Sequence, residues 1–406
     1  MRILLATHWL IPHVGGVWAF MEQLKNRLEA LGHVVDLLGN SPDYLKFHIV
    51  NRNQEIAKAH FLPMLETKLS ASNQPHLSRS SIVRYYELER YCMELSAAYF
   101  GLEQYDLIHT QDVLSTRSIS RVKPRHTAHV AHIHGCVATE MMLHYQLNPY
   151  LGIGEHSPEW KYFRSLEHYG ASSCDITVTS THWMRNLLVQ EFGVPSEQIT
   201  VFQYGFDSHS FAAKIGQGTP VQRPVGKKVI ICPARLVFIK GINVLISALA
   251  KLKEIRQDWV CWIVGDGDMR ETLEQLSFRL GLQGDVFFLG RRDDVPALLH
   301  ISDIFVHPCL QDNQPYSVVE AQFAGLPAVV SNGGGLPEMV ENGKTGLVSP
   351  VGDPDSLCAN IASLLQNDAY RKELGDNAKV WAQSHWSMDQ MVNRVLEVYE
   401  KAMKKV

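Results

Sequence analysis

The sequence lacks the features that mark secreted, membrane-spanning or nucleic-acid-binding proteins. None of its 7 cysteines forms a Cys-x-x-Cys pair, and their scatter does not indicate a disulfide framework. No apolar run is long enough to cross a bilayer, and the N-terminal stretch lacks the apolar region and cleavage site of a signal peptide. The formal net charge of −4 gives no field that would attract nucleic acid. We therefore expect a cytoplasmic protein, with at most a peripheral contact at the inner face of the membrane.

The 406 residues exceed what one ordinary hydrophobic core needs and fit two domains. Short apolar runs alternate with amphipathic stretches almost throughout, which predicts parallel α/β architecture. Residues 212–228 are rich in Gly, Pro and Lys without periodicity, so they predict a linker. We expect an N-terminal domain over residues 1–211, a C-terminal domain over residues 212–384, and a last helix within residues 385–406 that packs back onto the first domain.

A pair of cations follows the first predicted strand of the second domain. Arg235 and Lys240 lie in the loop after this strand, and Gly241 opens the next helix. Two cations beside free helix N-terminal amides suit a diphosphate, and open parallel sheets bind ligands beyond the carboxyl ends of their strands. Two solvated surface charges are the alternative interpretation.

Two acidic residues flank the start of a later predicted helix. Asp312 precedes this helix and Glu320 lies within it. Carboxylates accept hydrogen bonds from paired hydroxyls, so both are candidates for holding a sugar or a ribose. The free amides near Tyr316 and Ser317 would face an anion. A capping role for Asp312 and an ordinary surface position for Glu320 stay open.

Two features of the first half are candidates for ligand contact. Gly15 and Gly16, in HVGGVWAF, let a ligand approach the backbone between the first strand and helix, although a plain tight turn has the same signature. His132 and His134 lie on one face of a strand that ends at Gly135. His134 can donate a hydrogen bond to a bound hydroxyl or lend positive character as charge develops, and a structural histidine is the alternative. Zinc is not indicated, because no acidic or cysteine ligand has metal-type spacing with these histidines.

In this order, the segments resemble the large retaining glycosyltransferase family 4, which has the GT-B fold. In the second half the resemblance rests on PARLVFIKG, IVGDGDMRETLEQL, VFFLGRRDDVPALLH, DNQPYSVVEAQFAGLPAVV, GGLPE and NGKTGLV. In the first half it rests on the Gly-Gly turn, HIHG, TSTHWMRNLL and VFQYGFDSHSF. The resemblance implies two Rossmann-like parallel α/β domains that face each other across a cleft.

The resemblance also implies roles for individual residues. Arg235 and Lys240 match the basic pair that neutralises the donor diphosphate and the departing nucleotide. Glu320 matches the second glutamate of the Glu-x7-Glu motif, which holds the ribose hydroxyls. Asp312 stands where the first glutamate, which touches the donor sugar near C3 and C4, is usual. Its arm is one methylene shorter, so the chain departs from the family at the sugar contact.

Further donor contacts are implied around these residues. The amides of residues 313–317 would cradle sugar and phosphate, and His134 matches the histidine at the C6 hydroxyl of the sugar. Gly15 and Gly16 match the loop that closes over the diphosphate, and Arg291 lies where the base usually packs. The predicted donor-binding side chains of the segment after the fourth strand of the second domain are Asp312, Asn313, Gln314, Tyr316 and Ser317.

The implied reaction is the transfer of a hexosyl group from a UDP- or GDP-sugar to a saccharide, lipid-linked or small-molecule acceptor, with retained configuration and without metal or cofactor. We expect a role in bacterial cell-surface or spore-coat polysaccharide biosynthesis. Residues 44–90, polar with basic and aromatic residues interspersed, are predicted to form irregular helices and loops that contact the acceptor. Two alternatives remain open: a sugar-nucleotide epimerase or phosphorylase-like enzyme on the same architecture, and an inert sugar-nucleotide-binding module.

Overall fold

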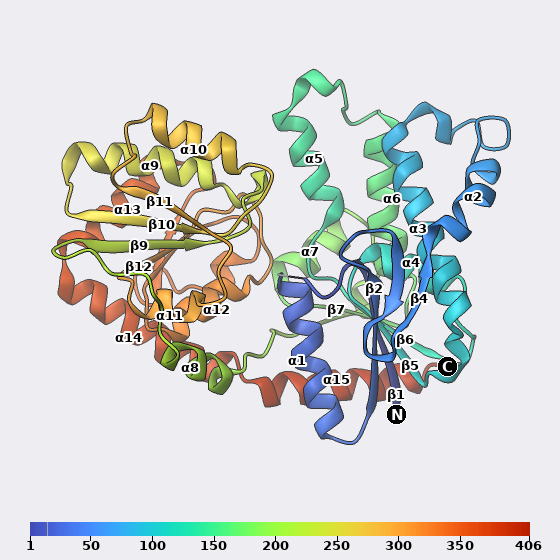
Figure 1. Cartoon of the computed structure of the whole chain (residues 1–406). Coiled ribbons are helices and arrows are strands. Elements are labelled where there is room, and N and C mark those ends of the chain that lie inside the picture. The colour runs from blue at the N-terminus through green and yellow to red at the C-terminus, as the bar shows by residue number, and fades with distance from the viewer. Residues whose placement is uncertain (14) are drawn as a thin grey trace. The chain divides into compact units, whose positions relative to one another are not determined.

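The computed structural model describes residues 1–13 and 15–406, and the chain divides into two compact units (Figure 1). The first unit comprises Met1–Gln203 and Asp389–Val406, and the second comprises Tyr204–Met388. The second unit thus begins before the predicted boundary at residue 212. The reason is that Phe206 and Phe211, on the segment that leads into the predicted linker, belong to the apolar core of the second unit.

The first unit contains an eight-stranded sheet in the order β4-β3-β2-β1-β5-β6-β7-β8, in which the last six strands are parallel. The strands are β1 (Arg2–Leu10), β2 (Val34–Asn40), β3 (Lys46–Ile49), β4 (Gln54–Ala57), β5 (Leu107–Thr110), β6 (Ala128–His132), β7 (Ile176–Thr179) and β8 (Ile199–Val201). The helices are α1 (Gly16–Ala30), α2 (Leu62–Lys68), α3 (Ser81–Phe100), α4 (Val113–Ser120), α5 (Val137–Leu147), α6 (Pro158–Ser172), α7 (His182–Gln190) and α15 (Met388–Met403).

The C-terminal helix α15 is part of the first unit apart from its first residue. The hydroxyl of Tyr399 lies 2.8 Å from Nδ1 of His109 on β5, and both side chains are buried. The apolar side chains of α15, such as Val395 and Val398, are buried as well. The last helix is therefore a structural element of the N-terminal sheet, although it is the last segment of the chain.

Residues 44–90 are more regular than the sequence predicts. β3 and β4 extend the first sheet as an antiparallel edge, and α3 runs for 20 residues. The side chains of Phe47 and Ile49 on β3 enter the core while their neighbours face outward. Strands this short have too few residues for the alternation to stand out among polar neighbours, so the sequence analysis missed them.

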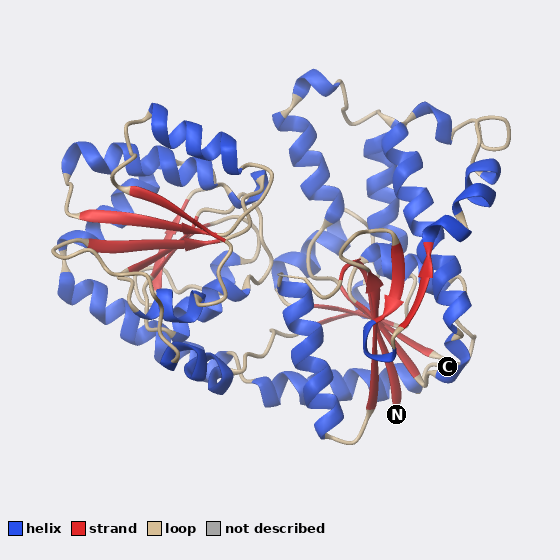
Figure 2. Cartoon of the chain, in the orientation of Figure 1, coloured by secondary structure: helices blue, strands red, loops and turns tan. Residues whose placement is uncertain are grey.

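The second unit contains a six-stranded, all-parallel sheet in the order β11-β10-β9-β12-β13-β14. The strands are β9 (Lys228–Pro233), β10 (Trp259–Val264), β11 (Val286–Gly290), β12 (Ile304–His307), β13 (Ala328–Ser331) and β14 (Gly346–Ser349). The helices are α8 (Ser208–Gly216), α9 (Ile242–Ile255), α10 (Arg270–Arg279), α11 (Val295–His300), α12 (Tyr316–Phe323), α13 (Pro354–Gln366) and α14 (Asp368–His385). Figure 2 shows helices on both faces of this sheet.

Packing on both faces explains why the interiors of the strands of the second unit are apolar, with polar residues at strand ends. On β9, Ile230 and Cys232 enter the core on one face, while Val229 and Ile231 enter the core on the other. Period-two alternation of side chains sends successive residues to opposite faces, so a sheet covered on both sides needs continuous apolar runs. Among the described residues, no helix combines the length and the apolar character that a membrane crossing requires.

The strand order of each sheet reverses once, and this positions the candidate site. In the second sheet the chain adds β10 and β11 on one side of β9 and β12 to β14 on the other. In the first sheet β2 lies on one side of β1 and β5 on the other. Connections leave in opposite directions at such a point, and open parallel sheets bind ligands beyond the carboxyl ends of the two central strands there.

Candidate active site

The loop after β9 carries the predicted cation pair. Arg235 is exposed in this loop, and Lys240 ends the short 3-10 helix η7 (Phe238–Lys240) that precedes α9. Gly241 follows with a φ of 64°, and a Cβ there would lie 2.2 Å from the carbonyl oxygen of Pro308. This close approach requires glycine. It brings the loop after β9 against the end of β12, so Lys240 lies beside the segment that carries Asp312.

Lys240, His307 and Asp312 form one hydrogen-bonded network at this edge of the sheet. Nζ of Lys240 lies 2.5 Å from Oδ2 of Asp312, and Nε2 of His307 lies 3.0 Å from the same oxygen. The other oxygen, Oδ1, accepts the amide N–H of the buried Asn313 at 3.0 Å. Both oxygens of the carboxylate predicted to contact the donor sugar are thus engaged by the protein, and the carboxylate holds the Lys240 ammonium.

Pairing keeps this largely shielded network charged. Burial would raise the pKa of Asp312, but Lys240 and His307 hold it below its usual range. Burial would likewise lower the pKa of Lys240, whereas Asp312 keeps it above its usual value. The pKa of His307 is lowered by burial, with Asp312 offsetting part of the effect, so His307 is neutral at pH 7 and donates its Nε2–H. The network therefore contains one ammonium, one carboxylate and one neutral imidazole.

The side chains of Gln314 and Tyr316 anchor the start of α12. Oε1 of Gln314 accepts the N–H of Tyr204 at 2.9 Å, and the rings of Tyr316 and Tyr204 stack with their centroids 5.6 Å apart. The hydroxyl of Tyr316 donates to the carbonyl of Gly205 at 3.4 Å. The side chains of Gln314 and Tyr316, both predicted to contact the donor, thus bind residues 204–205 at the start of the second unit. At the start of α12, the backbone amides of Tyr316 and Ser317 are the groups suited to an anion.

Glu320 lies one helical turn after Tyr316, on the same side of α12. Burial raises the pKa of this carboxyl from 4.5 to about 7, and Lys214 on α8 offsets part of the effect. A carboxyl with such a pKa is present in both its protonated and its ionised form at neutral pH. Glu320 can therefore change its hydrogen-bonding capacity within the physiological pH range.

Arg291 follows β11 and is exposed. The amide of Gly265, after β10, donates to the carbonyl of Gly290 at 2.9 Å, so the ends of β10 and β11 lie side by side. Arg291 thus stands on the same carboxyl edge as Arg235, two strands away along the order β11-β10-β9.

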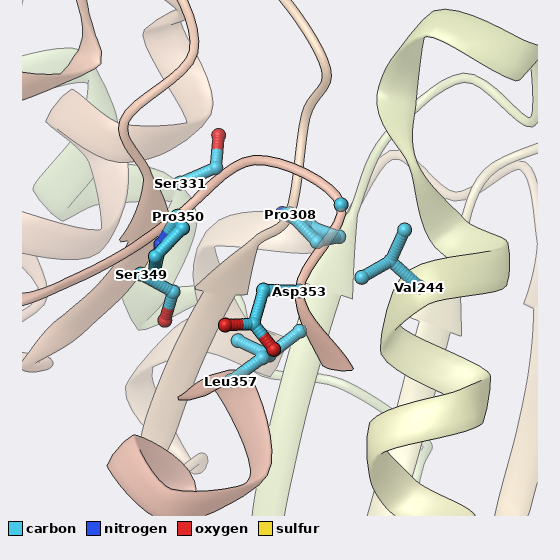
Figure 3. Close-up of a pocket in the computed structure, with 8 residues that line it drawn as sticks. Val244, Pro308, Ser331, Ser349, Pro350, Asp353 and Leu357 are labelled. Atoms are coloured by element: carbon cyan, nitrogen blue, oxygen red, sulfur yellow. The ribbon is translucent and has the colours of Figure 1, made fainter. Parts of the chain in front are cut away.

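A small hollow opens beside this site, near the carboxyl ends of β12, β13 and β14 (Figure 3). Together with its open mouth it holds about 190 Å³, less than a ligand pocket needs. The carboxylate of Asp353 at the hollow caps α13 by accepting the amides of Asp355 at 2.9 Å and Ser356 at 3.1 Å. The hollow is therefore a feature of packing. It is lined by Val244, Pro308, Ser331, Ser349, Pro350, Gly352, Asp353 and Leu357.

His307, Cys309 and Asp312 place three atoms of metal-ligand type within 4.8 Å of one another. Sγ of Cys309 lies 3.0 Å from the carbonyl oxygens of both Ile239 and Gln311, and its one S–H can donate to either of them. The ammonium of Lys240 lies on the carboxylate of Asp312. The Lys240 ammonium therefore supplies the positive charge beside the Asp312 carboxylate.

The predicted glycine turn in the first unit leads directly into α1. Gly15 is the N-cap of α1 with an extended backbone, at a φ of 170°, and Gly16 begins the helix. Both are exposed, and a Cβ on Gly15 would meet no described atom closer than 3.9 Å. The backbone at Gly15 does not itself require glycine, and the contact of Gly15 with a ligand stays a prediction. Val14, in the same turn, lies outside the described residues.

His134 lies two residues beyond the end of β6, in a group of packed rings. Its ring stacks on His132 with centroids 4.4 Å apart, and Phe20 of α1 packs edge-on at 4.9 Å. Nε2 of His134 lies 2.9 Å from Oε1 of Gln111. Because Nε2 of Gln111 donates to the carbonyl of His109 at 3.0 Å, its Oε1 is the acceptor, and His134 carries its proton on Nε2.

Burial and the neighbouring His109 lower the pKa of His134 to about 3. The ring is therefore neutral at physiological pH, and the positive character that the sequence analysis allowed for it is absent there. A neutral His134 can interact with a ligand through hydrogen bonds and packing, with its ring fixed by His132, Phe20 and Gln111.

Two residues of these networks were missed by the sequence analysis. His307 ends β12 and holds Asp312, and Gln111 follows β5 and holds His134. Each is a polar residue at the carboxyl end of a buried strand (DIFVH and LIHTQ). A polar residue at a strand's carboxyl end could have been recognised as a candidate site residue. Which predicted residue its side chain contacts, however, depends on the strand order.

Comparison with known proteins settles the family. Residues 14–210 match the model of Glycosyltransferase Family 4, and residues 219–381 match the model of Glycosyl transferases group 1. The chain belongs to glycosyltransferase family 4. This glycosyltransferase is 27% identical to an uncharacterised glycosyltransferase of Methanocaldococcus jannaschii over 99% of both chains. It is 32% identical to spore coat protein SA of Bacillus subtilis, over 43% of this chain and 49% of that protein.

The fold of the glycosyltransferase agrees with that of solved structures. It is similar to Anabaena Alr3699/HepE in complex with UDP and glucose, with a TM-score of 0.71 over 98% of this chain and 99% of that one. The two sequences are 19% identical, so the likeness concerns the fold. The two parallel-sheet α/β units are thus those of the GT-B fold, as the sequence analysis predicts.

Proposed function

We propose that this glycosyltransferase moves a hexosyl group from a UDP- or GDP-sugar to an acceptor hydroxyl, with retention of anomeric configuration. The observation that carries the proposal is the position of two anion-binding elements in the second sheet. The loop with Arg235 and Lys240 follows β9, and the amide end of α12 follows β12. These two strands flank the reversal of strand order, where parallel sheets bind nucleotides.

The cations make the nucleoside diphosphate a good leaving group. Lys240 has three N–H donors and gives one to Asp312, so two remain for phosphate oxygens. Arg235 is exposed and offers a planar fork to the same group. Because Asp312 holds Lys240 before a ligand arrives, little reorganisation is needed as negative charge develops on the leaving oxygen. We propose that these cations and the α12 amides take the place of a metal ion, and that no cofactor is used.

The transfer itself exchanges one bond at the anomeric carbon. The bond from C1 to the β-phosphate oxygen breaks, and the bond from C1 to the acceptor oxygen forms on the same face. The acceptor proton passes to the departing phosphate oxygen. We assign no covalent nucleophile, and we propose that His134 contacts the donor sugar as a neutral hydrogen-bonding group.

The donor and the pathway are part of the proposal. Anabaena Alr3699/HepE, which has a similar fold, has been solved with UDP and glucose, which supports a UDP-sugar as the first donor to test. The similarity to spore coat protein SA supports a product in a bacterial cell-surface or spore-coat polysaccharide. The match of both halves to glycosyltransferase models favours a transferase over an epimerase, a phosphorylase or an inert binding module.

Thermal unfolding with a panel of UDP, GDP, ADP and dTDP, and of their sugars, tests the donor site. A ligand that binds only the folded state at a hundred times its Kd stabilises it by about 2.7 kcal/mol. We expect one nucleotide to raise Tm of the wild type by several degrees and to lose most of this effect in Arg235→Ala. Arg279→Ala, at an exposed arginine of α10, is the matched control.

If no nucleotide raises Tm at saturating concentration, the proposal fails. Once a donor is known, its incubation with acceptors separates the alternatives. A transferase releases nucleoside diphosphate and glycosylates the acceptor, whereas an epimerase changes the sugar of an intact donor and an inert module does neither. The anomeric configuration of the product, read by NMR, tests retention.

Donor binding is expected to strengthen as pH rises through about 7. Above this pH Glu320 is ionised, and a carboxylate accepts both hydroxyls of a ribose, whereas the protonated group accepts less well. Calorimetric Kd values for a nucleotide sugar at pH 6, 7 and 8 measure the effect, because its diphosphate does not titrate in this range. Glu320→Gln is expected to give one flat, weaker affinity across the three pH values. An unchanged pH dependence in this variant would assign the titration to another group.

The same pKa shift has a consequence for stability. The folded state keeps the proton of Glu320 up to a pH of about 7, while the unfolded chain loses it near 4.5. The unfolded state therefore binds fewer protons between these values, and the free energy of unfolding falls as pH rises across this window. Ligand-free Glu320→Gln is accordingly expected to be more stable than the wild type at pH 8.

A further inference from the structure

A second polar cluster lies in the first unit, at the carboxyl end of β1. Nζ of Lys58, in the 3-10 helix η2 (Lys58–His60), lies 2.5 Å from Oε2 of Glu89 on α3. Nε2 of His8 on β1 lies 4.0 Å from the same oxygen. Only 4% of Lys58 and 5% of His8 is exposed. Nδ1 of His8 is buried and, in the described part of the chain, has no hydrogen-bond partner. Buried polar atoms of this kind are usually satisfied by an ordered water, an ion or a ligand when the protein supplies no partner.

The cluster carries no net charge. The ammonium of Lys58 and the carboxylate of Glu89 compensate each other. Burial and the neighbouring Lys58 lower the pKa of His8 to about 3, so its imidazole is neutral. A ligand with its own charge would leave that charge uncompensated beside these buried groups, at a cost of several kcal/mol. The cluster therefore suits a neutral ligand rich in hydrogen-bonding groups.

Partly exposed aromatic rings surround this cluster. The ring of Tyr44 lies 5.5 Å from Nζ of Lys58, and the ring of Trp9 packs edge-on against His8 at 6.0 Å. Tyr85 lies one helical turn before Glu89 on α3, and burial, with smaller contributions from Glu89 and Tyr44, raises the pKa of its hydroxyl. Aromatic faces beside hydrogen-bonding charged groups match a sugar ring, whose C–H groups stack while its hydroxyls bind polar atoms. The exposed fractions are 43% for Tyr44, 37% for Trp9 and 55% for Tyr85.

The backbone holds Tyr44 in an unfavourable conformation. Its φ is 61°, in the left-handed region that residues other than glycine and asparagine avoid. The turn is fixed by the amide of Tyr44, which donates to the carbonyl of Ser41 at 2.9 Å, and by Asp43, which accepts the amide of Leu45 at 3.0 Å. Strain of this kind is concentrated at functional sites.

We propose that Lys58, Glu89, His8 and the ring of Tyr44 bind a neutral sugar ring of the acceptor. The inference rests on the proposed function and names its acceptor class. In the sheet order, β1 neighbours β5 and β5 neighbours β6, after which His134 stands. Adjacent strands are about 4.8 Å apart, so the carboxyl ends of β1 and β6 are separated by roughly 10 Å along the sheet.

Saturation-transfer NMR on the full chain without donor tests this site. The probes are methyl α-D-glucopyranoside, methyl α-D-mannopyranoside and methyl α-D-galactopyranoside, with glucose 6-phosphate as the charged comparison. We expect at least one neutral glycoside to bind the wild type and to bind Tyr44→Asn at least tenfold more weakly. Asparagine tolerates the left-handed backbone, so this variant keeps the turn. Tyr99→Ala, at a 64% exposed tyrosine elsewhere on α3, is the control and is expected to bind as the wild type does.

The double variant Lys58→Met, Glu89→Gln removes both charges together and is also expected to weaken glycoside binding at least tenfold. The proposal is overturned if no neutral glycoside binds, if glucose 6-phosphate binds more tightly than they do, or if Tyr44→Asn binds like Tyr99→Ala. Nucleotide-induced stabilisation is measured on the same proteins. If nucleotides do not stabilise the wild type, the proposed donor site is refuted. If nucleotides still stabilise the variants that no longer bind the glycoside, the weakened glycoside binding is assigned to the acceptor site.

Discussion

Replacing Lys240 with methionine is expected to lower the rate of sugar transfer by about a hundredfold to a thousandfold. Removing one preorganised group that stabilises developing negative charge costs a reaction about this factor. Lys240 is such a group, because Asp312 at 2.5 Å holds its ammonium in place before a diphosphate arrives. The measurement is kcat for nucleoside diphosphate release with a saturating donor and acceptor. Lys251→Met, at a surface lysine of α9 paired with Asp355, is the matched control and is expected to retain full activity.

A second variant separates catalysis from folding. Lys240→Met alone leaves the mostly buried carboxylate of Asp312 without its cation, which destabilises the protein. Lys240→Met, Asp312→Asn removes both charges and is expected to regain stability without regaining activity. If this double variant transferred sugar at the wild-type rate, the ammonium would serve the structure only, and the role of Lys240 at the diphosphate would be refuted.

Replacing Gly241 with alanine is expected to destabilise the protein by about 3 kcal/mol or more. Two costs add at this position: a left-handed backbone, at a φ of 64°, and a Cβ placed 2.2 Å from the carbonyl oxygen of Pro308. The first costs about 1–2 kcal/mol, and the second forces the loop after β9 away from the end of β12. Urea denaturation measures the change in the free energy of unfolding.

Gly281→Ala is the control for Gly241→Ala. Gly281 has a similar φ of 70°, but an added Cβ there would meet no described atom within 4 Å. It is therefore expected to show the backbone cost alone. Equal losses of stability in both variants would mean that the contact between Gly241 and Pro308 is not tight. Nucleotide binding by folded Gly241→Ala is also expected to weaken, because Lys240 moves with its neighbour.

Local sequence patterns determined much of this protein. Apolar runs of five or six residues, as in β9 after Lys228 and in β10, specify strands covered on both faces, and their alternation with amphipathic helices specifies a parallel sheet. The same alternation of strands and helices places Arg235 and Lys240 after one strand and α12 after another. These features depend on residues close together in the chain, which is why the sequence alone was sufficient to place them.

Only the tertiary structure decided how these residues are paired and charged. The sequence placed Asp312 at a sugar, and the structure pairs it with Lys240 and His307, which lie on a different loop and on the preceding strand. The sequence allowed His134 a positive charge, whereas burial, with His109 nearby, lowers the pKa of the ring to about 3. Both outcomes depend on strand order and on desolvation. Strand order brings together segments far apart in the chain, and desolvation is a property of the packed core, so neither is encoded in the spacing of a motif.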